Sequence, residues 1–430
     1  MKLLMNLDSM TDKRSKKNKE GERASNKKLN RHQTFAALQF PNYRLWFQGQ
    51  IVSLFGTWMQ TTAQGFLIYE LTHSPAYLGY VGFASGIPAW LLTLYGGVIA
   101  ARVPRRTLLI ITQSAMMVFA FILAALAFTH LVQPWHVVLL SFCLGTANAF
   151  DAPARQSFVG EMVDREYLTN AIALNATMFH TATAIGPAVA GVTYALFGPA
   201  WCFTINGISF IAVIVALQMM RIEPQPHLAN AGGEGKFMEG ILYVVRHDLI
   251  RVIIGIVALN SLFTLSLTTL IPAWSVKVLG GDATTNGFLS SARGMGSLMG
   301  ALVIATLGRI SYRGKLVTFG SFLAPVLLLV FATVHWLPLS LVVMAGIGVG
   351  TIMVMNLANA LVQTSTPEHL RGRVMGAYTW IFFGFMPIGA LWSGELAARF
   401  GLAETVTING ILALLAAIAI WAFFPKLREK

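Results

Sequence analysis

Apolar stretches recur along the chain from Leu45 to about Phe424, separated by short polar loops. A helix that crosses a bilayer needs about 20 predominantly apolar residues. By this criterion the spans lie at approximately 45–69, 75–99, 106–129, 135–155, 168–196, 199–219, 250–274, 284–307, 315–334, 337–363, 373–398 and 402–424. We therefore expect an all-α membrane protein with twelve transmembrane helices.

The amino-acid composition agrees with a membrane protein and excludes a soluble one. Hydrophobic residues make up 55% of the 430 residues and charged residues only 11%, whereas soluble globular proteins have about 25% charged residues. A soluble fold of this size has too little interior to bury so much apolar surface. The composition therefore excludes a soluble protein and indicates that lipid surrounds most of the chain.

The net charge of +13 is concentrated on one side of the predicted spans. If the amino terminus is cytoplasmic, all but three of the 31 Lys and Arg residues fall on the cytoplasmic side, the exceptions being Lys277, Arg293 and Arg399. Membrane proteins carry such an excess of basic residues in their cytoplasmic loops. The charge therefore predicts that both termini are cytoplasmic, and it gives no reason to expect a nucleic-acid partner.

A polar stretch after the sixth predicted span divides the chain into two parts. Pro and Gly residues at 223–226 and 232–235 predict a flexible linker, and the apolar spacing that follows predicts an amphipathic helix on the membrane surface. The expected domains are a disordered basic cytoplasmic tail (1–44), a six-helix bundle (45–220), a cytoplasmic linker with an amphipathic helix (221–249), a second six-helix bundle (250–424) and a short cytoplasmic tail (425–430).

The two halves are also related in sequence. The matches at an offset of 203 residues are Gly186 with Gly389, Gly191 with Gly394, and Thr204–Ile–Asn–Gly207 with Thr407–Ile–Asn–Gly410. Two homologous six-helix halves are typical of transporters, in which the substrate site lies between the halves near the middle of the membrane. A duplicated helix bundle that transports nothing is the alternative.

Longer segments carry a more specific pattern. They are NYRLWFQGQIVSLFGTWMQ (42–60), YELTHSPAYLGYVGFASGIP (69–88), NAFDAPARQSFVGEMVDREYLTNAIALN (148–175) and AIGPAVAG (184–191). Together they resemble the major facilitator superfamily and, within it, the transmembrane secretion effector branch that contains the enterobactin exporter. The resemblance implies two pseudo-symmetric six-helix bundles of the major facilitator fold, alternating access, export of a solute, and a bacterial cytoplasmic (inner) membrane.

The loop between the second and third helices departs from the superfamily pattern. The superfamily has an acidic residue ahead of a basic cluster, but Ala101 stands in the acidic position here. The basic residues Arg102, Arg105 and Arg106 remain. They are either part of a cytoplasmic gate or topology signals at the lipid surface.

Two further groups are candidates for gating. Asp151 and Arg155 are four residues apart, so they share a helix face and can pair; the pair is either an alternative gate or a local ion pair. Gly186, Pro187 and Gly191 resemble the motif that superfamily antiporters share in the fifth helix. Small residues allow close helix packing and proline permits a bend, so this segment is either a hinge or a rigid packing contact.

In the major facilitator fold, the first, fourth, seventh and tenth helices line the central cavity. Amide side chains on these helices face protein or water rather than lipid. The predicted cavity residues are Gln60, Gln64, Asn148, Asn260, Asn356, Asn359 and Gln363. They predict a mostly uncharged, amphipathic cavity; for each residue the alternative is an interhelical hydrogen bond, worth about 0.6 kcal/mol on average.

Charged and titratable residues inside the predicted spans are few. Arg293 either recognises an anionic or catecholate-like solute in the cavity or bonds backbone carbonyl groups. The candidates for proton coupling are Glu395, Asp151 and His180, in that order. Glu395 can instead pair with Arg399, and a histidine, whose ordinary pKa is near 6.5, can instead be a structural hydrogen-bonding residue.

No Walker-type GxxxxGK[ST] motif, convergent catalytic constellation or metal-ligand cluster occurs in the sequence. We therefore expect neither an enzyme nor a cofactor or metal. The sequence predicts a monomeric secondary active transporter that exports an amphipathic small molecule, such as a siderophore, an antibiotic or another metabolite or drug, by proton antiport across the lipid bilayer. The alternatives are an importer or uniporter on the same fold, and a non-transporting membrane sensor.

Overall fold

The computed structural model describes residues 34–221, 234–306 and 312–428. Within these ranges the chain forms helices and contains no strand. Residues 1–33 of the predicted tail, the linker residues 222–233, the loop 307–311 and the last two residues lie outside the described part. The rest of the segment predicted to be a disordered tail is structured: a 3-10 turn spans Ala36–Gln39, a long helix begins at Pro41, and Ala37 and Tyr43 are buried.

Eleven of the long helices are α3 (Pro41–Thr72), α4 (Pro75–Arg102), α5 (Arg105–Phe128), α6 (Pro134–Met162), α7 (Leu168–Phe197), α8 (Pro199–Met219), α12 (Ala283–Thr306), α13 (Arg313–Thr333), α14 (Leu337–Ser365), α15 (Glu368–Phe400) and α16 (Leu402–Phe423). The twelfth is the composite segment Asp248–Lys277. It consists of α10 (Asp248–Leu259), the π-helical turn η2 (Asn260–Thr264) and α11 (Leu267–Lys277).

The segments correspond to the predicted spans in order and approximate extent. In the described residues, nine helices are long and apolar enough to cross a membrane. The other three, α3, α4 and α7, reach 28 residues or more but fall outside that set. The all-α membrane fold is thus confirmed, whereas a count of twelve crossings stays a prediction.

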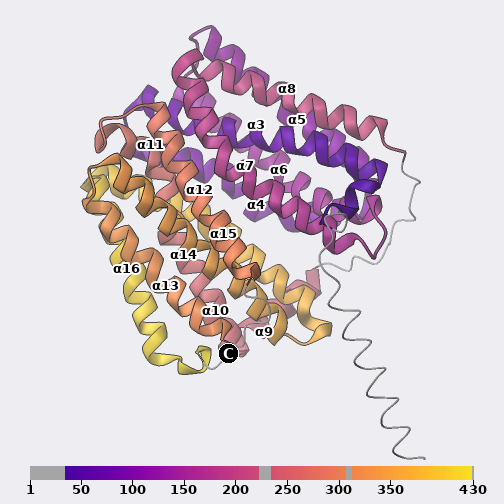
Figure 1. Cartoon of the computed structure of the whole chain (residues 1–430), viewed down its shortest axis with the longest axis vertical. Helices are drawn as coiled ribbons and strands as arrows, with labels where there is room; N and C mark the ends of the chain where they lie inside the picture. The colour runs from indigo at the N-terminus through magenta and orange to yellow at the C-terminus, as the bar shows by residue number, and fades with distance from the viewer. Residues whose placement is uncertain (1–33, 222–233, 307–311, 429–430) are drawn as a thin grey trace, which may run out of the picture.

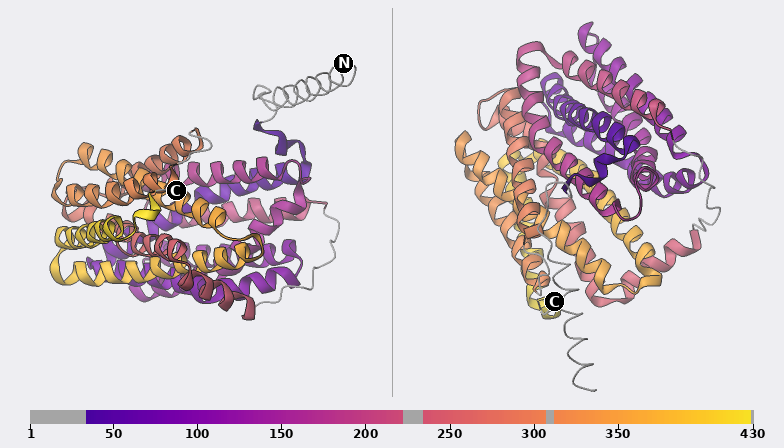
Figure 2. Two further views of the ribbon diagram at one scale, coloured as in Figure 1. Left: turned by 90° about the horizontal axis from the view of Figure 1, so that it is seen from below. Right: turned by 45° about the vertical axis from the view of Figure 1, so that its right-hand side comes forward.

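The helices pack as two groups that lie side by side (Figures 1 and 2). In the first group, α3 packs against α7 and α8, and α6 packs against α4 and α5. In the second group, α14 packs against α12 and α13, and α13 also packs against α16. The groups meet chiefly along two helix pairs, α4 with α15 and α7 with α12, which we call the two seams.

Short connections at equivalent positions reflect the internal repeat. Gly198 joins α7 to α8 with φ of +85°, and Gly401, which is 203 residues later, joins α15 to α16 with φ of +102°. Residues with a side chain rarely adopt these angles, so glycine is required for both tight turns. The repeat seen in the sequence is therefore also a repeat of backbone geometry.

Among the described residues, the hydrophobic core is continuous between the groups at one end of the molecule only. The largest cluster of buried residues there combines Tyr69 and Tyr194 of the first group with Trp274, Phe331 and Met344 of the second. We call this the closed end. It contains the carboxyl-terminal part of α3 and the beginning of α12.

At the opposite end each group has its own core. Trp46 and Phe158 belong to a cluster confined to the first group, and Ile253 and Tyr378 belong to one confined to the second. We call this the split end. The amphipathic helix α9 (Glu234–Arg246) packs here against α15, so the helix predicted in the linker is present.

Glycines bring the backbones into contact along both seams. A Cβ atom on Gly191 would lie 2.5 Å from the carbonyl oxygen of Ala283, and one on Gly394 would lie 2.7 Å from the Cα of Gly79. Gly191 and Gly394 are 203 residues apart, so the repeat places the same residue at the same point of each seam. Both contacts lie towards the closed end.

We predict that Gly191→Ala and Gly394→Ala each destabilise the protein, because the new methyl group forces the seam apart at a cost of about 1–3 kcal/mol. Gly97→Ala is the matched control, since nothing lies within 4 Å of a Cβ atom there and alanine favours a helix by up to about 1 kcal/mol. Thermal unfolding of the purified protein measures the effect. Equal unfolding midpoints for all three variants would contradict the seam contacts.

Candidate functional site

The two amides predicted on the first helix are buried within the first group. Gln60 is 3% exposed and accepts a hydrogen bond from Asn206 Nδ2 at 2.6 Å. Gln64 is 6% exposed and donates from Nε2 to Ser141 Oγ at 2.5 Å. For both residues the structure favours interhelical bonding over contact with a solute.

Asn260 faces the interior of the second group. It is 8% exposed and lines a small, partly open cavity together with Thr264, Thr318 and Ser321. The walls come from α10 and η2 on one side and from α13 and α16 on the other. This cavity lies within the second group rather than between the groups, so the structure does not bring Asn260 together with the other predicted cavity residues.

The remaining predicted amides are accessible. Asn148 on α6 and Asn356 on α14 are both exposed, and Gln363 donates a hydrogen bond to Asn359 at 2.7 Å. Asn356, Asn359 and Gln363 follow one another at helical spacing and share one face of α14. Because exposed amides are unfavourable against lipid, these side chains are the best candidates in the described residues for a surface that contacts water or solute.

Arg293 lies near the middle of α12 and close to the seam with α7. It is partly buried, and its Nε is enclosed without a hydrogen-bond partner. The neighbouring Gly294 packs against the carbonyl oxygen of Thr183 on α7, and the carbonyl oxygen of Arg293 itself approaches Gly348 on α14. The guanidinium group therefore extends from a point where three helices meet.

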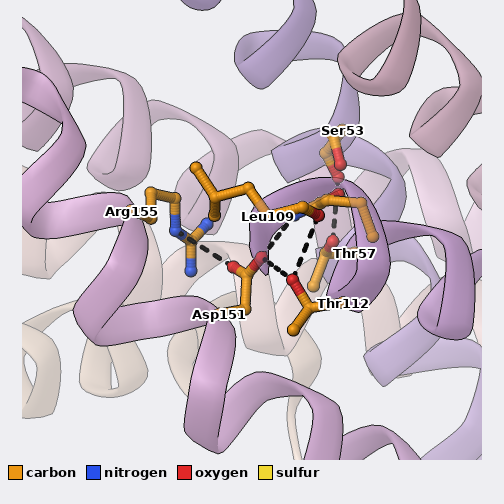
Figure 3. A network of polar contacts seen from close by, with 7 residues as sticks. Ser53, Thr57, Leu109, Thr112, Asp151 and Arg155 are labelled. Carbon is orange, nitrogen blue, oxygen red and sulfur yellow. Dashed lines mark hydrogen bonds and ion pairs between the residues drawn. The ribbon is translucent and has the colours of Figure 1, made fainter. Parts of the chain in front are cut away.

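Asp151 is held in a buried polar network between α5 and α6 (Figure 3). The side chain is 1% exposed. Its Oδ1 accepts hydrogen bonds from Thr112 Oγ1 at 2.9 Å and from Gln113 Nε2 at 2.8 Å, and its Oδ2 lies 3.4 Å from Nε of Arg155. The predicted pair with Arg155 is thus present, and all partners belong to the first group.

The sequence analysis missed the donors on α5. Thr112 and Gln113 are adjacent polar residues in an otherwise apolar stretch of α5, which is a signal that they need a polar partner inside the protein. It also missed the bond that the hydroxyl of Tyr194 donates to the carboxylate of Glu70, because nothing in the sequence pairs these two helices.

The basic loop after α4 also makes its contacts within the first group. Arg105 forms an ion pair with Glu161 at the end of α6, and Arg106 donates from Nη2 to the carbonyl oxygen of Gln218 at 2.8 Å. Arg102 is exposed. These contacts fix the loop in the present conformation, and a gating role for the three arginines stays a prediction.

The segment that resembles the antiporter motif lies on the seam between α7 and α12. A Cβ atom on Gly186 would meet the side chain of Trp58 on α3. The carbonyl oxygen of Pro187 lies against Gly287 of α12, and the backbone N–H of Ala188 donates to Ser291 Oγ at 2.8 Å. Whether this contact moves as a hinge stays a prediction.

Glu395 lies on the other seam, at the closed end. The hydroxyl of Tyr80 on α4 donates to Glu395 Oε1 at 2.5 Å, and Nη2 of Arg399 is 3.7 Å from Oε2. This proton-coupling candidate therefore bonds across the two halves as well as to the predicted local partner. His180 on α7 is partly buried, with its ring beside that of Phe179.

The structure offers no metal-binding cluster in the part of the chain that it describes: no three His, Cys, Asp or Glu side chains gather there.

Comparison with known proteins identifies the family. The model of the transmembrane secretion effector family matches residues 32–430. The staphyloferrin A transporter of Staphylococcus aureus is 25% identical over 90% of this chain and 97% of its own length. The multidrug efflux pump Tap of Mycolicibacterium fortuitum is 26% identical over 87% and 93% of the two chains. The enterobactin exporter EntS of Shigella boydii is 25% identical over 90% and 93%.

Solved structures show the same fold at lower identity. A POT family transporter in complex with 5-aminolevulinic acid matches with a TM-score of 0.73 and 11% identity, over 90% of this chain and 96% of that one. A bacterial homologue of the lysosomal transporter Spinster, in an inward-facing and unoccupied conformation, matches with a TM-score of 0.70 and 10% identity, over 93% and 99%. The chain is therefore a multi-pass membrane protein of the major facilitator superfamily and belongs to its transmembrane secretion effector family.

Proposed function

We propose that the protein is a secondary active transporter that exports an amphipathic small molecule across the bacterial cytoplasmic membrane by alternating access, in exchange for protons. A siderophore, an antibiotic or another metabolite or drug is the expected class of solute. The names of the relatives support this class, since they transport a siderophore or drugs. A non-transporting sensor and an importer are the competing functions.

The observation that carries the proposal is the asymmetry of the core. The halves share one hydrophobic cluster at the closed end and have separate clusters at the split end. Helices α5 and α13 begin with Arg105 and Arg313 at the split end, and basic residues favour the cytoplasmic side. We therefore assign the conformation as inward-facing, ready to accept a solute from the cytoplasm.

The accessible amide side chains are the candidates for contact with the solute. Asn148 on α6 and Asn356 on α14 come from the fourth helix of each half and are exposed. An alternating-access transporter presents the same residues to each side in turn, so these two are the first choice for solute contact. Arg293 is the third choice for solute contact. Of the remaining predicted residues, four have partners within one half, namely Gln60, Gln64, Asn359 and Gln363, and Asn260 lines a cavity inside the second group.

Glu395 remains the first candidate for proton coupling because it bonds across a seam. Tyr80 and Glu395 come from different halves, so this hydrogen bond breaks if the closed end opens. A protonated carboxyl group is a weaker acceptor than a carboxylate, so proton binding at Glu395 favours opening. Asp151 has all of its partners in one half, which favours a structural role.

Proton coupling is tested with purified protein in liposomes that contain a pH-sensitive dye. With an imposed proton gradient and a panel of siderophores and lipophilic drugs, we expect solute-dependent proton flux in the wild type. Glu395→Gln should reduce the flux to background. Glu404→Gln is the control, because Glu404 is an exposed acid near the closed end. Movement of labelled solute without proton flux would contradict antiport and indicate uniport, and flux in the opposite sense would indicate import.

We predict that Asp151→Ala lowers stability, because it leaves the buried Nε2 donor of Gln113 without an acceptor, at about 1–3 kcal/mol, whereas the hydroxyl of Thr112 keeps the carbonyl oxygen of Leu109. Asp151→Asn retains an acceptor and should cost less. Asp248→Ala is the control, since that aspartate is 74% exposed in a surface ion pair with Arg251, a type of contact worth about 0–1 kcal/mol. Thermal unfolding reports the order, and a stable Asp151→Ala variant that has lost only proton flux would instead favour Asp151 as the coupling residue.

A further inference from the structure

Arg293 differs in its surroundings from the five arginines that form ion pairs in the described residues. Arg105, Arg155, Arg251, Arg373 and Arg399 each lie within ion-pair distance of an Asp or Glu. In the described residues, Arg293 has neither an acidic partner nor a hydrogen bond, and its Nε is enclosed. The alternative of bonding to backbone carbonyl groups is therefore not realised in this conformation.

The position of Arg293 along α12 places it deep in the membrane. It is the eleventh residue of a helix of 24, so at a rise of about 1.5 Å per residue it lies about 15 Å from the start of the helix, close to half the thickness of a hydrocarbon core of about 30 Å. A cation at this depth is unfavourable unless it is compensated. Because no group in the described part of the protein compensates the positive charge of Arg293, we expect an anion from outside the protein to bind there.

The side of α12 that carries Arg293 faces away from lipid. Phe288, Met295 and Met299 are exposed along one side of the helix. At 3.6 residues per turn, Arg293 projects from the other side. Gly294, one residue later, still packs against Thr183 of α7. Gly296, on the opposite face of the helix, packs against Ala345 of α14. Arg293 thus lies beside the seam between α7 and α12, near the middle of α12.

We propose that Arg293 is the anion-binding residue of the transport pathway and that the exported solute carries a carboxylate group. This inference rests on the proposed transport function and narrows its substrate class. A guanidinium group presents paired N–H donors that match two oxygens of a planar oxyanion. The exposed amides Asn148 and Asn356 supply uncharged hydrogen bonds for the rest of an amphipathic molecule.

The first half of the inference, that Arg293 is an uncompensated cation, is tested by measuring the stability of the protein without solute. Because an uncompensated cation destabilises the empty protein, Arg293→Met should raise the thermal unfolding midpoint of the purified full chain in detergent. Arg155→Met is the matched control: it removes the partner of the buried Asp151, so it should lower the midpoint. A lower midpoint for Arg293→Met would show that the guanidinium group holds the fold together, and would overturn the proposal.

The second half of the inference, that Arg293 binds the anionic group of the solute, is tested by measuring the binding of defined small molecules. Citrate and 2,3-dihydroxybenzoate should raise the unfolding midpoint of the wild type, and 2,3-dihydroxybenzamide, which lacks the carboxylate, should raise it less. The stabilisation by the two anions should be lost in Arg293→Met and partly retained in Arg293→Lys, which keeps the charge without the paired donors. Equal stabilisation of wild type and Arg293→Met, or none in either, would overturn the anion assignment. Neither of these two assays depends on proton flux. A negative result in them is therefore distinguishable from failure of the proposed transport function.

Discussion

The two halves are held together by backbone contacts between glycine-containing helices at one end. Lipid tails are as apolar as the side chains of Leu or Ile, so burial of apolar surface gives little drive for helices to associate in a membrane. Close contact between helix backbones favours association instead. Gly287 lies against the carbonyl oxygen of Pro187, and Gly79 lies against Gly394. Because these contacts involve backbone, they are sensitive to the addition of a single methyl group.

The seams begin at the closed end, and the seam between α4 and α15 continues past the middle of the molecule, where Trp90 lies against Gly384 and Trp380. Polar bonds across the halves occur at the same end, between Tyr80 and Glu395 and between Ala188 and Ser291. At the split end each half is stabilised by its own core, as the proposed alternating access requires of halves that move as units. In the proposed alternating access, a tilt about the seams would change the access of water to Arg293 beside one seam and to the exposed amides Asn148 and Asn356.

Much of the fold was predictable because membrane helices and repeats leave strong signals. Apolar stretches placed the helices, and the offset of 203 residues anticipated that Gly191 and Gly394 make equivalent contacts. The direction of a polar side chain was harder to predict. Gln60 and Asn356 look alike in sequence, yet Gln60 bonds to Asn206 inside one half and Asn356 is exposed. The difference depends on which helices are neighbours, and one sequence does not specify that.

The central claim is that the halves rock about their glycine seams, and spin-label distances test it most directly. In a background with Cys143→Ser and Cys202→Ser, one label pair goes on Gly97 and Gly372 at the split end, where a Cβ atom meets nothing within 4 Å. A second pair goes on the exposed His73 and Phe400 at the closed end. When a transported solute and a proton gradient are applied in liposomes, the first distance should shorten while the second lengthens. Two unchanged distances, or two that change in the same direction, would contradict the account.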